Sequence, residues 1–213
     1  MNIASEIANK LLEIEAVKIN FENPFTWTSG LRSPIYCDNR KTLSYPEVRK
    51  LITEGYAQYI NSAYPRVNVI AGIATAGIAQ GALIAEDLNL SYCYVRPEPK
   101  KHGMKNQIEG HLINDARIVL IEDLISTGMS SLKAVDACRA EGAEVLAVVS
   151  IFNYGFDEAK DAFGKANCNF YSLCTLNDLM EQAVLNNYVK ESDFESLNLW
   201  RSNPKAWSEA QGI

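Results

Sequence analysis

The sequence predicts an α/β fold: a doubly wound, mostly parallel sheet flanked by helices. Short apolar runs alternate along the chain with segments of helical periodicity, which is the order of strand–helix–strand units. The run at residues 117–125 is almost continuously apolar, as is typical of a strand buried on both faces of a parallel sheet. For 213 residues with 47% hydrophobic content we expect one domain with appendages.

Elements of the N-terminal half follow from periodicity and turn residues. Apolar residues at helical spacing predict an amphipathic helix over residues 2–16. Ser44 as N-cap, Pro46 in the first turn and Glu47 predict a second helix that runs to about residue 61. The remaining pattern predicts a strand at 17–21, a hairpin within 25–40, and strands at 67–72 and 92–95.

The C-terminal half continues the alternation. It predicts a helix over 130–141 that ends before Gly142, strands at 144–151 and 169–173, and a helix opened by Thr175 and Asp178. We expect the last two tryptophans, Trp200 and Trp207, to dock on the body of the protein or on a dimer surface.

Composition limits the classes of function. A net charge of −6 and a pI near 5.1 argue against a general nucleic-acid or anionic-membrane binder. The five cysteines are odd in number and include no C-x-x-C pair, which favours reduced thiols in a cytosolic protein. The N-terminus lacks the apolar core of a secretory signal, and no apolar run approaches membrane-spanning length.

An acid pair and a small polar turn follow the central apolar run. Glu122 and Asp123 fall near the carboxyl end of the predicted strand, where parallel sheets bind ligands. Ser126, Thr127 and Gly128 then precede a helix, and the N–H groups of a helix N-terminus suit a phosphate. A solvated loop after a core strand is an equally simple interpretation of these residues. Walker and dinucleotide-binding glycine motifs are absent.

The stretch RIVLIEDLISTGMSS, residues 117–131, resembles the ribose-phosphate-binding motif of the type I phosphoribosyltransferases. The resemblance implies that the acids hold the ribose hydroxyls of phosphoribosyl pyrophosphate (PRPP) and that the next loop holds its 5-phosphate. Met129 stands where relatives often have a smaller residue. The implied PRPP-binding residues are Arg96, Lys100, His102, Glu122, Asp123, Leu124, Ile125, Ser126, Thr127, Gly128, Met129 and Ser130.

Residues 96–110 form a segment too long for an ordinary connection, with four Lys/Arg against one acid between Arg96 and Lys105. From the residues alone it is a solvated loop or a lid. The segment R-x-x-x-K-x-H-G followed by I-E-G resembles the catalytic loop of orotate phosphoribosyltransferases, which implies catalytic roles for Arg96, Lys100 and His102. In that family the loop closes over PRPP, often onto the partner subunit's site in a dimer. Pro97 and Lys101 depart from the family pattern.

Two other segments carry the same resemblance. FTWTSGLRSPIYCDNR, residues 25–40, is similar to the segment that lies over the pyrimidine in that family, with Thr28 in place of a frequent lysine. This implies that Ser29, Tyr36 and Ser126 contact orotate. Alanine and glycine predominate in AGIATAGIAQG, residues 71–81, which suits either tight packing or close approach to a ligand. The resemblance implies a pyrophosphate-binding loop formed by Ala74, Thr75 and Gly77.

The resemblance therefore implies orotate phosphoribosyltransferase activity on orotate and PRPP, with Mg²⁺ held mainly by PRPP and water. It also implies a cytoplasmic homodimer without a nucleic-acid or membrane partner. Within one domain we expect an N-terminal helix and hood (1–45), a core (46–175) and C-terminal helices (176–213). Another base-specific phosphoribosyltransferase, or a non-catalytic PRPP-sensing regulator, remains an alternative.

Overall fold

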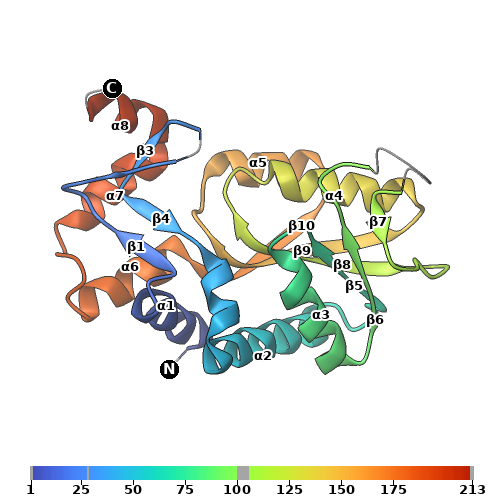
Figure 1. The fold of residues 1–213 in the computed structure, drawn as a ribbon. Coiled ribbons are helices and arrows are strands. Elements are labelled where there is room, and N and C mark those ends of the chain that lie inside the picture. The colour runs from blue at the N-terminus through green and yellow to red at the C-terminus, as the bar shows by residue number, and fades with distance from the viewer. Residues whose placement is uncertain (1, 28, 100–105, 212–213) are drawn as a thin grey trace.

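A central six-stranded sheet organises the molecule (Figure 1). The computed structural model describes residues 2–27, 29–99 and 106–211. All neighbouring strands pair in parallel except β6 and β7, which confirms the predicted fold class. The strands, in spatial order, are β10 (Asn169–Thr175), β9 (Glu144–Asn153), β8 (Arg117–Ile125), β5 (Val69–Ile73), β6 (Ser91–Val95) and β7 (Ile108–Glu109).

Strand β8 is buried on both faces because helices cover both faces of the sheet. Ile118 and Leu120 pack with residues of α4 and α5, whereas Val119 and Ile121 pack with residues of α1, α2 and α3. In Figure 1, α4 and α5 lie above the sheet and α2 and α3 below it. The helices are α1 (Ile3–Glu13), α2 (Pro46–Ala63), α3 (Gly77–Leu88), α4 (Met129–Ala140), α5 (Asp157–Lys165), α6 (Leu176–Leu185), α7 (Asp193–Ser202) and α8 (Pro204–Ala210).

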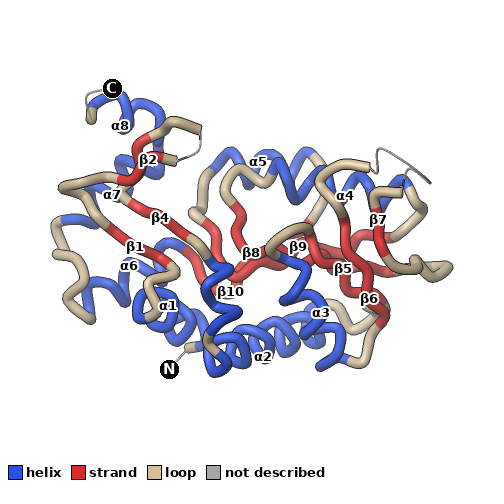
Figure 2. Tube along the Cα trace, in the orientation of Figure 1, coloured by secondary structure: helices blue, strands red, loops and turns tan. Residues whose placement is uncertain are grey.

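The N- and C-terminal elements gather at one end of the sheet (Figure 2). Two small antiparallel sheets lie there, formed by β1 (Val17–Ile19) with β4 (Ile35–Cys37) and by β2 (Phe25–Thr26) with β3 (Arg32–Ser33). The prediction that Trp200 docks on the body is confirmed, since its side chain is fully buried. Its ring lies 5.8 Å from that of Trp27 and 5.6 Å from that of Tyr154.

Several element predictions were wrong in detail. Ser44 does not cap α2, because it ends a 3₁₀ helix, η1 (Asn39–Ser44), and Tyr45 occupies the N-cap position. Helices α3 and α5 and strand β7 were not predicted. The capping box of Thr175 with Asp178 was predicted and is present. Within the described residues, none of the helices combines the length and apolar character needed to cross a bilayer.

Candidate active site

The candidate site lies at the carboxyl edge of the sheet, between β5 and β8. Strand β5 continues through α3 to β6 on one side, whereas β8 lies on its other side and continues through α4 to β9. The chain connections therefore diverge between β5 and β8, which makes this edge a topological switch point, the usual ligand site of such sheets. The loops that follow these two strands are the predicted pyrophosphate loop and the predicted phosphate loop.

Side chains from distant elements hold the backbone of the acid pair. The hydroxyl of Tyr56, on α2, donates to the carbonyl oxygen of Glu122 at 2.7 Å. The side-chain amide of Asn39, in η1, donates to the carbonyl oxygen of Asp123, also at 2.7 Å. Both acids stand near the end of β8, as predicted, and their main-chain positions are fixed by two hydrogen bonds from outside the sheet.

The two carboxylates have different environments, because consecutive residues of a strand point to opposite faces. Glu122 is only 6% exposed, and its Oε2 accepts a hydrogen bond of 3.1 Å from the hydroxyl of Ser131. Its Oε1 accepts one of 3.3 Å from the main-chain N–H of Asp123. The side chain of Asp123 is partly exposed. Of the two predicted ribose-binding acids, Asp123 is thus the more accessible.

Burial changes the ionisation of this pair. It raises the pKa of Glu122 to about 8, with a further contribution from the charge of Asp123. Burial also raises the pKa of Asp123, although hydrogen bonds from Glu122 and nearby main-chain N–H groups, together with the charge of Arg40, lower it in part. Burial of two neighbouring carboxylates therefore favours retention of a proton by the pair, chiefly at Glu122.

The phosphate loop begins where β8 ends. Gly128 has φ +80, and a Cβ at this position would lie 2.7 Å from the ring of Phe163, so only glycine fits the turn. Ser126 and Thr127 are partly exposed, and Met129 and Ser130 are exposed at the start of α4. Ile125 is 1% exposed within the core, so its side chain is excluded from a ligand contact and only its main chain can serve the site.

The predicted pyrophosphate loop lies against both neighbouring strands. The N–H of Ala74 donates to the carbonyl of Val95 at 2.8 Å, so this amide already has a partner. A Cβ at Gly77 would overlap the carbonyl oxygen of Ile121 and lie 3.6 Å from the Cα of Glu122. The peptide bond between Ala74 and Thr75 is cis, and Thr75 is exposed. Close packing at Gly77 therefore brings this loop next to the acid pair.

Arg96 follows β6 beside that loop. Its guanidinium forms an ion pair of 3.2 Å with Glu109 on β7. The main chains of Arg96 and Gln107 are joined by a hydrogen bond of 2.9 Å, and the side chain of Gln107 donates to the carbonyl of Arg96 at the same distance. The base of the catalytic loop is thus closed by three contacts. Lys100 and His102, the other predicted catalytic residues, lie outside the described residues.

The predicted base-binding residues lie in the hood. Tyr36, on β4, is 41% exposed, and its ring lies 5.8 Å from that of Phe25. Ser29 is exposed in the turn between β2 and β3. The indole of Trp27 donates to the carbonyl of Ile35 at 3.0 Å and so ties the hairpin to β4. Thr28 lies outside the described residues.

Sequence reasoning missed two residues that act on the acid pair, Asn39 and Tyr56. Tyr56 lies within the predicted helix that runs to about residue 61, and Asn39 lies in the CDNR segment after Tyr36, but neither had an assigned role. Their partners are 66 and 84 positions away in the chain. The signal that could have drawn attention to them is a polar group at a position where the neighbouring pattern predicts burial, because such a group needs a hydrogen-bond partner.

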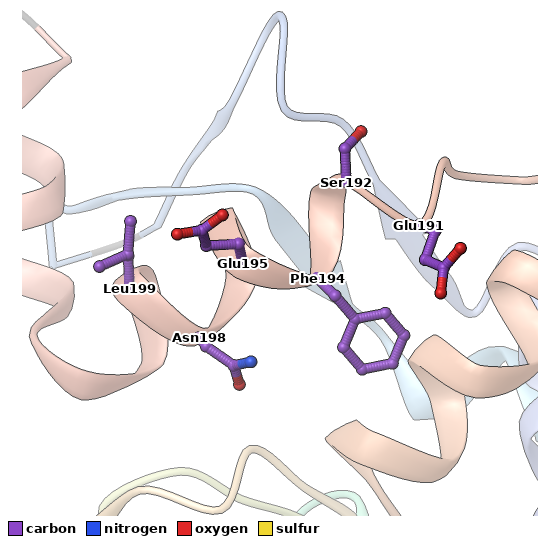
Figure 3. Close-up of a pocket in the computed structure, with 6 residues that line it drawn as sticks. All are labelled: Glu191, Ser192, Phe194, Glu195, Asn198 and Leu199. Atoms are coloured by element: carbon purple, nitrogen blue, oxygen red, sulfur yellow. The ribbon is translucent and has the colours of Figure 1, made fainter.

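One hollow away from the candidate site does not suit a phosphorylated ligand. A hollow beside α7 is lined by Glu191, Ser192, Phe194, Glu195, Asn198 and Leu199 (Figure 3). Its two acids and the absence of a lysine or arginine from this lining disfavour a phosphorylated ligand. No group of three or more His, Cys, Asp or Glu side chains in the described ranges is arranged to hold a metal ion.

Comparison with known proteins identifies similar chains. A phosphoribosyl transferase domain model matches residues 41–171. The orotate phosphoribosyltransferase of Cytophaga hutchinsonii is 51% identical and aligns over 98% of this chain and 100% of its own length. That of Porphyromonas gingivalis is 47% identical over 94% of this chain and 96% of its own. The crystal structure of the Aeropyrum pernix enzyme of the same name superposes with a TM-score of 0.74 and 27% identity, covering 84% of this chain and 98% of the other.

Proposed function

The chain belongs to the orotate phosphoribosyltransferase family, and we propose that its reaction takes place at the carboxyl edge of β8. The reaction transfers the 5-phosphoribosyl group of PRPP to orotate, giving orotidine 5-phosphate and pyrophosphate, a step of pyrimidine biosynthesis. One observation supports this location: the acid pair and the loops that follow β5 and β8 lie together at the topological switch point of the sheet.

The ribose hydroxyls are assigned to the acid pair. Asp123, the more accessible acid, accepts hydrogen bonds from the hydroxyls as a carboxylate. Glu122 keeps a proton near neutral pH because burial raises its pKa to about 8. Its main role is structural, because it accepts hydrogen bonds from the main-chain N–H of Asp123 and from the hydroxyl of Ser131 on α4. The 5-phosphate is assigned to the main-chain N–H groups and hydroxyls of residues 126–130, at the N-terminus of α4.

Bond breaking at C1 of the ribose places positive charge on the sugar and negative charge on the leaving pyrophosphate. The charge carried by the acid pair stabilises the sugar as that positive charge develops, so position and electrostatics matter more than a covalent nucleophile. We assign the leaving group to Arg96, Lys100 and His102 and to the loop of Ala74, Thr75 and Gly77. Proximity of this loop to Arg96 is supported by the hydrogen bond from Ala74 to Val95.

The base is assigned to the hood, with Tyr36 stacking on the pyrimidine and Ser29 and Ser126 as polar contacts. The exposure of the Tyr36 side chain, 41%, supports this assignment. Mg²⁺ fits the proposal as a hard cation bound to PRPP oxygens and water, where it would neutralise the pyrophosphate charge. The carboxylate oxygens of the acid pair are also ligands of the type that Mg²⁺ prefers.

We also propose the organisation of the working protein. It acts as one domain, with a hood (1–45), a core (46–175) and C-terminal helices (176–213), in a cytoplasmic homodimer whose catalytic loops reach the partner's site. Neither nucleic acid nor membrane is a partner. Light scattering of the purified protein would test the dimer, and a monomer at assay concentration that retains full activity would contradict it.

An ultraviolet assay of orotate consumption tests the activity. Orotate should be consumed only when PRPP and Mg²⁺ are both present, and pyrophosphate should appear in equal amount. Parallel assays with adenine, uracil and xanthine test the base, and consumption of one of them in place of orotate would indicate a different specificity. Absence of turnover together with a gel shift on DNA would instead support the PRPP-sensing regulator.

A further inference from the structure

Asn39 is a buried polar residue to which no substrate contact is assigned, although it lies within the 25–40 segment. It is 1% exposed, in η1 between β4 and α2. Its side-chain amide donates to the carbonyl oxygen of Asp123 across 84 positions of the chain, at 2.7 Å. This is the only side-chain hydrogen bond among the described residues that joins the hood segment of residues 1–45 to the acid pair.

The orientation of the Asn39 amide follows from its partner. A carbonyl oxygen only accepts hydrogen bonds, so the NH₂ group of Asn39 must face Asp123. The other end of the amide, Oδ1, is buried and has no partner among the described residues. An unsatisfied buried acceptor is unfavourable. A side chain needed only to fill space would avoid that cost, which indicates that the donor to Asp123 is what the site requires.

The segment around Asn39 is held firmly. The buried hydroxyl of Thr42 donates to the carbonyl of Asn39 at 2.6 Å. The N–H of Asp38 donates to the carbonyl of Ala16 at 2.7 Å, which continues the pairing of β4 with β1. Asn39 therefore presents its amide from a fixed element. The same element begins three residues after Tyr36, the residue assigned to the base.

We propose that Asn39 is a positioning residue, which fixes the end of β8 so that the carboxylate of Asp123 faces the ribose of PRPP. This inference rests on the proposed function. Tyr36, the residue assigned to the base, precedes Asn39 in the same hood segment. Tyr56 holds the adjacent carbonyl of Glu122 in the same way from α2, on the other side of the chain.

Substitution of Asn39 tests the proposal, because it should change the KM for PRPP but not the KM for orotate. Asn39→Ala should raise the KM for PRPP by roughly tenfold, the scale of one lost hydrogen bond, and leave the KM for orotate within about twofold. Thr53→Val is the control, because it removes a hydrogen bond of 2.9 Å to the carbonyl of Arg49 within α2 and touches neither Asn39 nor Asp123. It should leave the KM for PRPP unchanged.

A double-mutant cycle identifies the residue through which Asn39 acts. In an Asp123→Asn background, Asn39→Ala should add little to the KM for PRPP, since the carboxylate it positions is already gone. Additive effects would overturn the proposal, as would an equal rise of the KM for PRPP in Thr53→Val. If Asn39→Ala does not fold, Asn39→Ser replaces it in the same cycle. Wild-type protein inactive on orotate and PRPP would refute the proposed function itself, whereas unchanged Asn39 variants of an active enzyme refute only this inference.

Discussion

Glu122 and Asp123 differ in environment although they are neighbours of like charge. The strand directs Glu122 toward Ser131 on α4, where it is nearly buried, and leaves Asp123 partly open to the site. Two adjacent carboxylates in a desolvated position resist simultaneous ionisation. The pair therefore combines one charge that can bind a sugar with one proton that relieves repulsion, and its behaviour should depend on pH.

Replacement of Glu122 by glutamine should stabilise the protein at alkaline pH. Burial raises the pKa of Glu122 from 4.5 to about 8, so the folded state binds more protons than the unfolded state between these values. Stability of the wild type therefore falls as pH rises from about 4.5 through about 8. Glu122→Gln has no carboxyl group to ionise, so its stability should not fall in this way. Thermal unfolding at pH 5, 7 and 9 should show that the midpoint of the variant exceeds that of the wild type by an amount that grows with pH. A difference in midpoint that does not change with pH would contradict the raised pKa.

Replacement of Asp123 by asparagine should weaken PRPP binding selectively. Loss of charge from a hydrogen-bonding carboxylate should raise the KM for PRPP by about tenfold or more and change the KM for orotate much less. Asp136→Asn, on the exposed side of α4, removes the same charge from outside the site and serves as control. An unchanged PRPP titration for Asp123→Asn would remove this residue from the ribose assignment.

At the residue scale, the sequence predicted the features that are formed by residues close together in the chain. The acid pair and the Ser-Thr-Gly turn are contiguous, so their order along a strand and a helix start was visible in the letters. Asn39 and Tyr56 were not, because each meets the acid pair only after the sheet has formed. Nor does a sequence show that strand alternation would bury Glu122 more deeply than Asp123.

At the element scale, most strands and the helices with clear periodicity or a terminal signal were predicted, whereas α3, α5 and β7 were missed. Strand β8 has a continuous apolar run, and Gly142 with φ +84 follows the end of α4 as expected. Helix α5 has nine residues, and Phe156 at its N-cap makes no side-chain capping hydrogen bond, so the sequence carries no capping signal for its start. Strand β7 has two residues and exists because it pairs with β6, a tertiary cause that no local signal contains.

The predicted catalytic loop should become less accessible to protease when PRPP binds. Its base is closed by the contacts of Arg96 with Gln107 and Glu109, so both ends are fixed at the edge of the sheet. We expect PRPP with Mg²⁺ to protect residues 98–108 from trypsin, which cleaves after lysines such as Lys100 and Lys101, because a basic loop closes over an anionic ligand.

Cleavage at Lys190 is the internal control for that experiment. This lysine is exposed between α6 and α7, in the C-terminal segment rather than at the edge of the sheet, and its cleavage should not depend on PRPP. Mass spectrometry of the fragments separates the two regions. Equal cleavage within 98–108 with and without PRPP would count against closure of the loop.

At the scale of the whole molecule, the C-terminal helices hold the hood in place. Trp200 on α7 contacts the rings of Trp27, Tyr154 and Phe156, and so joins the N-terminal hairpin to the end of β9. The hydroxyl of Ser208 on α8 accepts a hydrogen bond of 2.9 Å from the N–H of Arg32. The docking of Trp200 was predictable from its hydrophobicity, but its partner was not, because the contact joins opposite ends of the chain.

Truncation of Trp200 should therefore affect base binding at a distance. Trp200→Ala should destabilise the fold by about 3–5 kcal/mol, the usual cost of emptying such a site, and raise the KM for orotate more than that for PRPP. Trp200→Phe keeps an aromatic ring and removes an indole N–H that has no partner among the described residues, so it should lie much closer to wild type. Leu199→Ala, at a side chain 62% exposed on the same helix, controls for changes in α7 itself. Denaturant unfolding measures the loss of stability, and kinetics at denaturant concentrations well below the unfolding midpoint measure the change in binding. An equal rise in both KM values for Trp200→Ala would mean that α7 supports the whole fold and not the base site in particular.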